Sequence, residues 1–114
     1  YMDTITWEEF EKVNIRVGTI IEATDFKEAR KPAYKLQIDL GKEIGIKKSS
    51  AQITTKYTKE SLIGKQVLCV INFPKKQIGP FMSEVLTTGC ITDKDGTIIL
   101  ITPDQKVANG LRLA

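Results

Sequence analysis

The chain has 114 residues, which is enough for one domain with a single hydrophobic core. Its composition, 41% hydrophobic and 27% charged, is ordinary for a soluble globular protein, and no apolar run approaches the ~20 residues that a membrane-spanning helix needs. The acidic N-terminal stretch lacks the basic start and apolar core of a secretory signal. We therefore expect a cytoplasmic protein with no membrane insertion.

Positive charge is concentrated in the middle third of the chain. Residues 41–80 contain eight lysines and two glutamates, a local charge of +6, whereas nine basic and twelve acidic residues elsewhere give −3. A basic region within a mildly acidic body favours an anionic partner, such as nucleic acid or an acidic polypeptide. The simpler interpretation is that these lysines keep exposed strand edges soluble.

The first predicted element is a short helix. Thr6 is suited to the N-cap, and Glu9 three residues later completes a capping box. Trp7, Phe10 and Val13 then fall near one stripe of the helix. An amphipathic segment of this kind requires an apolar surface to pack against.

After this helix the hydrophobic period changes to two. Residues 14–26 and 34–40 both resemble strands, and the second alternates apolar and polar positions throughout. Gly18 stands where a small barrel needs a sharp bend or a bulge. A third strand is predicted after the connection at residues 41–45.

The second half of the chain begins with a segment that does not alternate. Residues 53–64 favour a short helical connection that ends at Gly64. Residues 66–73 are apolar on both faces, which is typical of a central strand, and Pro74 ends the run. The remaining strands are predicted at 83–91 and 96–100, with a turn at 93–96 between them.

Short strands at near-regular spacing, with one helical insert after the third, favour an all-β fold. We predict a five-stranded OB-fold Greek-key barrel rather than a sandwich. Residues 1–114 are expected to form one domain. In it, residues 1–13 contain the N-terminal helix and residues 14–114 contain the barrel and a C-terminal segment.

The sequence lacks the usual signatures of catalysis. There is no histidine, and phosphate-binding loops, nucleophile elbows and paired-cysteine metal spacings are missing. Cys69 and Cys90 lie in apolar, strand-like segments without a nearby partner, so we expect two reduced, buried thiols. The interpretation is a non-catalytic binding protein without metal or cofactor.

The ligand face of such a barrel is expected on its middle strands and the loops that flank them. Lys75 and Lys76 can reach phosphates, and Phe73, Phe81 and Met82 can supply stacking or apolar contact. The alternative for Phe81 and Met82 is that they close one end of the barrel as core.

At this point the sequence resembles the tRNA-binding OB family, and within it the CsaA branch of export-related chaperones. The resemblance runs from about residue 10 to residue 110 and is carried by "NIRVGTIIEATDF", "EIGIKKSSAQIT", "VINFPKKQIGPFMSEVLTTGCI" and "TPDQKVANG". The family also includes the C-terminal domain of bacterial methionyl-tRNA synthetase. The resemblance implies a dimer that binds tRNA or unfolded, pre-export polypeptides.

The same resemblance implies which residues line the ligand groove. It assigns there Arg16, Ser50, Gln52, Asn72, Lys75, Lys76, Ser83 and Glu84. The argument from charge and aromatic character adds Lys47, Lys48, Phe73, Phe81 and Met82. Val85 and Leu86 replace the glycine and methionine of typical tRNA-binding members, which weakens the expectation of an ordinary contact to the tRNA elbow.

For the dimer, the family pattern makes Trp7, Phe10 and Leu111 interface candidates, the alternative being packing within one subunit. Three functions follow. The leading one is a homodimeric binding protein for tRNA, unfolded polypeptide or both. The others are a dedicated tRNA-binding protein without a chaperone role and a detached synthetase appendage.

Overall fold

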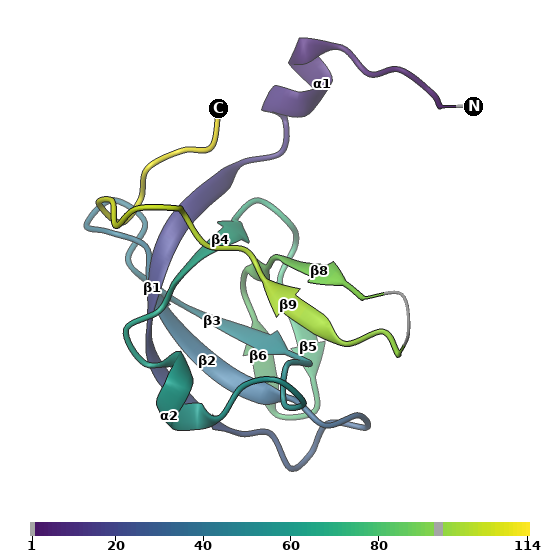
Figure 1. Cartoon of the computed structure of the whole chain (residues 1–114), viewed down its shortest axis with the longest axis vertical. Coiled ribbons are helices and arrows are strands. Elements are labelled where there is room, and N and C mark those ends of the chain that lie inside the picture. The colour runs from purple at the N-terminus through teal and green to yellow at the C-terminus, as the bar shows by residue number, and fades with distance from the viewer. Residues whose placement is uncertain (1, 93–94) are drawn as a thin grey trace.

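Antiparallel strands wrap into a nearly closed barrel in the computed structural model, which describes residues 2–92 and 95–114 (Figure 1). One five-stranded sheet forms most of the wall, in the order β3-β2-β1-β4-β7. Its strands are β1 Ile15–Asp25, β2 Tyr34–Asp39, β3 Ile46–Ala51, β4 Gln66–Val70 and β7 Leu86–Thr87. The predicted all-β barrel of OB type is confirmed.

Strand β1 is the longest and pairs on both sides, with β4 along its first half and with β2 along its second. A sharp bend or a bulge was expected at Gly18, but the register shift lies between Ile20 and Glu22. Gly18 serves a different purpose, because a Cβ atom there would lie 2.5 Å from Ile38 Cγ2 and 2.8 Å from Leu40 Cδ2. The glycine lets β1 pack closely on core side chains of β2 and of the residue that follows it.

The core follows the predicted alternation of β2, whose Tyr34, Leu36 and Ile38 point inward and are buried. Helix α2, Lys59–Leu62, places the fully buried Leu62 in the same cluster and is followed by Gly64 at a φ of +87°. The predicted helical connection is therefore confirmed, although only four of its residues are helical. Full burial of an aliphatic side chain contributes about 1.5–3 kcal/mol, so this cluster holds the barrel together.

The region after β4 differs most from prediction. Strand β4 ends at Val70, and a hairpin that was not predicted follows, with β5 Lys76–Ile78 paired to β6 Phe81–Ser83 across Gly79 and Pro80. The single strand predicted at 83–91 is wrong. It is divided into β6, β7 and β8 Gly89–Ile91, the last paired with β9 Ile98–Leu100. The predicted turn at 93–96 lies partly outside the described residues.

The break at 84–85 has a visible cause, because the backbone leaves one partner strand for another there. Glu84 N donates to Lys48 O at 2.7 Å and Val85 N donates to the same oxygen at 3.3 Å. These bonds join the end of the β5–β6 hairpin to β3, so the chain passes beside β3 between β6 and β7.

The two cysteines differ. Cys69 is fully buried on β4, as predicted, whereas Cys90 is exposed. The prediction of two buried thiols is wrong for Cys90 because β8 belongs to a separate two-stranded sheet, where one face remains open to solvent.

Helix α1, Trp7–Glu11, stands away from the barrel beside the C-terminus (Figure 1). The predicted capping box is confirmed: Glu9 N donates to Thr6 Oγ1 at 3.1 Å, and Thr6 N donates to Glu9 Oε1 at 3.0 Å. The C-terminal segment runs along β1, where Gly110 N donates to Val17 O and Leu113 N donates to Ile15 O. Within the described residues no helix is long and apolar enough to cross a membrane.

Candidate nucleic-acid interface

A groove of about 390 Å³ lies between β3 and the β5–β6 hairpin and is called the hairpin groove here. Its floor is apolar and open, with Phe73 55% exposed and Leu86 47% exposed. Six of the predicted ligand residues line it, namely Ser50, Gln52, Phe73, Lys76, Ser83 and Glu84, together with Pro74, Ile78, Val85 and Leu86. These six residues, predicted from the sequence, therefore lie together, although the hairpin that forms one wall was not predicted.

Two of these residues fix the position of the wall. Ser50 N donates to Ser83 Oγ at 3.1 Å, and Lys48 N donates to Glu84 Oε1 at 3.0 Å. Both side chains thus supply acceptors that a regular β-ladder would take from the backbone of a neighbouring strand. Ser83 and Glu84 line the groove and also close the barrel.

The carboxylate of Glu84 is surrounded by positive charge. Its partial burial works to raise its pKa, but the hydrogen bond from the Lys48 backbone and the charges of Lys47 and Lys75 outweigh this effect, and the pKa is lowered. Lys75 Nζ lies 3.5 Å from Glu84 Oε2. Lys75 therefore already has a counter-charge, whereas Lys76 makes no ion pair within the described part of the chain.

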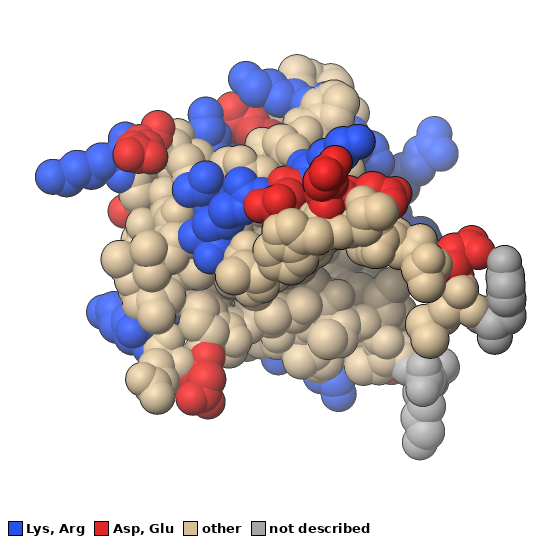
Figure 2. Space-filling view, turned by 90° about the horizontal axis from the view of Figure 1, so that it is seen from above, with Lys and Arg blue, Asp and Glu red and all other residues tan. Residues whose placement is uncertain are grey.

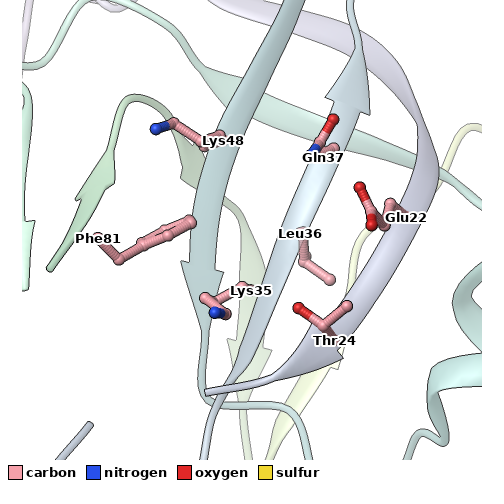
Figure 3. A pocket seen from close by; sticks show the side chains of 7 residues that line it. All are labelled: Glu22, Thr24, Lys35, Leu36, Gln37, Lys48 and Phe81. Carbon is pink, nitrogen blue, oxygen red and sulfur yellow. The ribbon is translucent and has the colours of Figure 1, made fainter. Parts of the chain in front are cut away.

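A second hollow of about 230 Å³ lies on the outer face of β1, β2 and β3, and is called the sheet pocket (Figure 3). Its lining residues are Glu22, Thr24, Lys35, Leu36, Gln37, Lys48 and Phe81. Sequence reasoning singled out Lys48 and Phe81 but not Glu22, Lys35 or Gln37. For Lys35 and Gln37 the signal was the alternation of β2, because every position between the buried residues of that strand must face outward.

Phe81 closes one side of the sheet pocket and is half-buried. Its ring centroid lies 5.3 Å from that of the buried Phe26, tilted by 60°, and Lys48 Nζ lies 5.5 Å from its centroid. The two interpretations of Phe81 each hold in part, because one side packs on the core and the other faces the pocket.

Other predicted ligand residues lie apart from both hollows. Arg16 Nε donates to Asn14 Oδ1 at 2.8 Å and its Nη1 donates to Gly110 O at 3.0 Å, so its guanidinium holds the C-terminal segment. Asn72 Oδ1 accepts from Asn14 N at 3.0 Å and its Nδ2 donates to Lys12 O at 2.6 Å. Lys47 lies on β3 opposite Ile38, and Met82 is half-buried on β6 opposite Gln77.

The interface candidates lie at the α1 end of the molecule. Trp7 and Phe10 have ring centroids 5.3 Å apart, and with Leu113 they line a small hollow. Trp7 is 63% exposed and Leu111 is 50% exposed. Viewed from this end, charged side chains gather in the upper part of the surface and a broad uncharged area lies below them (Figure 2).

A family model that matches almost the whole chain identifies the family. Residues 15–112 match the family model described as "Putative tRNA binding domain". The chain belongs to this tRNA-binding domain family. The fold and the predicted family membership therefore agree, since OB barrels bind nucleic acids across the strands and loops where the two hollows lie.

Known members of the tRNA-binding domain family include both enzymes and small proteins. Methionine–tRNA ligase of Leptospira biflexa is 39% identical over 106 residues, covering 93% of this chain but 15% of the ligase. The chain thus spans about 15% of the length of the curated relatives it matches.

Two solved structures correspond to the whole chain. The chaperone CsaA of Bacillus anthracis has a TM-score of 0.91 and 43% identity, covering 98% of this chain and all of that one. The CsaA chaperone protein of Picrophilus torridus has a TM-score of 0.90 and 52% identity, covering 97% of this chain and all of that one. The predicted resemblance to the CsaA branch of the tRNA-binding domain family is confirmed.

The described residues of this family member offer little for metal chemistry. Among them, no group of three or more Cys, Asp or Glu side chains is placed to hold a metal ion. Burial raises the pKa of the Cys69 thiol to about 12, so it stays protonated and unreactive. What the two hollows do offer is cationic groups beside apolar and aromatic surface, which is an arrangement for binding.

Proposed function

We propose that the chain is a non-catalytic, cytoplasmic tRNA-binding module that uses the hairpin groove and the adjoining sheet pocket. One observation carries the proposal: Lys76 lines the hairpin groove together with Phe73, Lys48 lines the sheet pocket together with Phe81, and Lys75 lies beside them on Glu84. Lysines attract the phosphate backbone, and exposed rings provide faces on which bases stack. The family match to a tRNA-binding domain supports the same ligand.

The two components of this surface make different contributions. Each lysine that neutralises a phosphate releases counterions, so its contribution falls as salt rises. Stacking of a base on an aromatic ring contributes about 1–3 kcal/mol and depends little on salt. The role is the same whether the domain acts alone or within a longer protein, because it holds RNA and performs no chemistry on it.

The test is to change Lys75 and Lys76 together to Ala and to titrate the protein with tRNA at two salt concentrations. We expect weaker binding and a smaller salt slope, which is the fall of log affinity with log salt concentration. Each neutralised phosphate contributes about 0.7 to this slope on a single strand, and the variant should lose up to about two such contributions. Folding should be retained, because exposed lysines contribute little to stability. The matched control is Lys42→Ala with Lys106→Ala, which removes two exposed charges outside the groove.

The control variant should bind tRNA with nearly the affinity of the unchanged protein. If both double variants lose affinity equally, the binding is a general effect of net charge and not a property of the groove. Unchanged tRNA affinity in the Lys75 and Lys76 variant would place the tRNA site elsewhere on the protein.

A second candidate function is capture of unfolded polypeptide in the hairpin groove. It is favoured by the exposure of Phe73 and Leu86, whose apolar side chains line an open groove, and by the similarity to the two CsaA chaperones. An extended, apolar segment of an unfolded precursor would cover this floor. Burial of apolar surface drives such binding and is much less sensitive to salt than phosphate contact.

Parallel titrations distinguish the two functions. An unfolded secretory precursor and bulk tRNA are each added to the protein at low and at high salt. Polypeptide capture predicts precursor affinity that changes little with salt and falls in a Phe73→Ala variant. If the precursor does not bind at either salt concentration, the chaperone function is excluded and tRNA binding remains.

A further inference from the structure

The sheet pocket has polar side chains that the fold itself does not use. In the register of β1, β2 and β3, Glu22, Gln37 and Lys48 are directly opposite one another and form one row across three strands. Thr24 and Lys35 begin the next row along the same face. Within the described chain, none of the side chains of Glu22, Gln37 and Lys48 makes a hydrogen bond or an ion pair to another residue.

Glu22 is unexpected on a surface that attracts RNA, because a carboxylate repels phosphate. It becomes useful if it binds a base. A carboxylate only accepts hydrogen bonds, and among the neutral bases guanine alone presents two adjacent donors, N1–H and N2–H, on its Watson–Crick edge. Adenine and cytosine each pair one donor with a ring acceptor that Glu22 would repel, and uracil presents one donor between two acceptors.

Gln37 lies where it can bind the remaining group on the Watson–Crick edge of guanine, the O6 acceptor. Directly opposed residues on antiparallel strands have Cβ atoms about 4.5–5.5 Å apart, so the Gln37 carboxamide lies beside the Glu22 carboxylate. Its NH₂ group can donate to guanine O6 while the carboxylate accepts from N1–H and N2–H. The pair therefore offers one donor and two acceptors, in the order that the guanine edge requires.

The rest of the pocket suits the remainder of a nucleotide. Phe81 closes the side opposite Glu22, where its ring can contact the base (Figure 3). Lys48 Nζ lies 5.5 Å from the Phe81 centroid, and its flexible stem allows the ammonium to move onto a phosphate. The volume of about 230 Å³ is below the range of about 300–1,000 Å³ that is typical of sites for drug-sized ligands, and it suits a single base.

We propose that the sheet pocket binds one unpaired guanine of an RNA strand. Glu22 and Gln37 read its Watson–Crick edge, Phe81 contacts the ring, and Lys35 and Lys48 hold the flanking phosphates. This inference rests on the proposed RNA-binding function and adds a base preference to it, at a site distinct from the hairpin groove.

The test uses short uridine oligomers whose central base is U, G, A or C, with affinity measured by fluorescence anisotropy. We expect the guanine oligomer to bind about 5- to 150-fold more tightly than the other three, the discrimination given by one bidentate base contact. In Glu22→Gln the preference should disappear, because the amide that replaces the carboxylate cannot accept both hydrogen bonds. Glu60→Gln is the matched control, since it removes an exposed carboxylate on α2 and should keep the preference.

The outcomes separate this inference from the proposed function. Equal affinity for all four oligomers, with tRNA binding intact, overturns the guanine site and leaves the tRNA-binding module in place. A guanine preference that persists in Glu22→Gln overturns the role of the carboxylate. Guanosine monophosphate that competes as tightly as the guanine oligomer overturns the assignment to an RNA strand. If neither tRNA nor any oligomer binds, the proposed function fails together with this inference.

Discussion

Phe81 shows that one side chain can pack against a buried residue and also line a pocket. Its ring packs against the buried Phe26 at a centroid distance of 5.3 Å, and its other side faces the sheet pocket. Aromatic pairs of this geometry add stability beyond the area they bury. A mutation at this position must therefore change stability and binding together.

We predict that Phe81→Ala lowers the free energy of unfolding by about 1–3 kcal/mol, less than the 3–5 kcal/mol of a fully buried ring. The same change should weaken tRNA binding by about 1–3 kcal/mol, with little change in salt slope. Thermal melting and tRNA titration measure the two effects. Phe73→Ala is the comparison, because that exposed ring should affect binding alone; loss of stability there and not at Phe81 would contradict the assignment.

The two thiols should react at very different rates. Cys90 is exposed, whereas Cys69 is buried and its pKa is raised to about 12. A chromogenic thiol reagent at mildly alkaline pH should therefore modify Cys90 in the native protein and reach Cys69 after unfolding. Modification of Cys90 should leave tRNA binding intact, since it lines neither hollow. Rapid reaction of both thiols in the folded protein would show that β4 opens.

At the scale of elements, the decisive feature is how β3 meets the chain between β6 and β7. We call this junction between β3 and residues 83–85 the seam. Side chains as well as backbone hold it together, because Lys48 N donates to Glu84 Oε1 and Ser50 N donates to Ser83 Oγ. The seam also forms one edge of the hairpin groove. Conditions that weaken it should therefore loosen both the barrel and the hairpin groove.

Acid should remove the stability that the Glu84 carboxylate contributes to the seam. The pKa of Glu84 is lowered below the ordinary value of 4.5 in the folded protein, so its carboxylate contributes stability that is complete above about pH 4.5. That contribution is lost as pH falls through the folded-state pKa. We expect Glu84→Gln to melt at a lower temperature than the unchanged protein at neutral pH, and the difference to vanish in acid. A difference that stays constant with pH would show that charge is not responsible.

At the scale of the whole molecule, α1 has no buried residue and stands clear of the barrel beside the C-terminal segment (Figure 1). Trp7 and Phe10 pack on each other but leave most of Trp7 exposed. An amphipathic element is stable when its apolar stripe is covered. We propose that a second copy of the chain covers it, forming a homodimer through Trp7, Phe10 and Leu111.

The homodimer predicts that Phe10→Asp converts the protein to a folded monomer, because an unpaired carboxylate in the interface is strongly unfavourable. Sedimentation velocity at micromolar concentration measures the change, and circular dichroism checks that the barrel persists. Ile63→Asp is the control, since Ile63 is also exposed but follows α2 on another part of the molecule. A monomer before any mutation would exclude the homodimer.

The sequence by itself determined the features that depend on local patterns. The alternation in β2 and the capping box at Thr6 are set by side chains a few residues apart, so they could be read directly. The spacing of the short strands indicated the barrel, and the resemblance of whole segments to the tRNA-binding domain family indicated the approximate position of the hairpin groove. Ser50, Gln52 and Lys76, which the resemblance named, and Phe73, which its aromatic character suggested, line this groove.

Tertiary structure alone decided the features that depend on long-range contacts. The sequence 83–91 reads as one strand, but the hydrogen bonds of Glu84 and Val85 to Lys48 divide it. From the sequence, Arg16 and Asn72 were expected to contact a ligand. In the structure, Arg16 donates to the C-terminal segment and Asn72 donates to the connection after α1. Glu22 and Gln37 became a pair through strand register, which depends on the bulge after Ile20. Register is a relation between strands, so no single strand's pattern contains it.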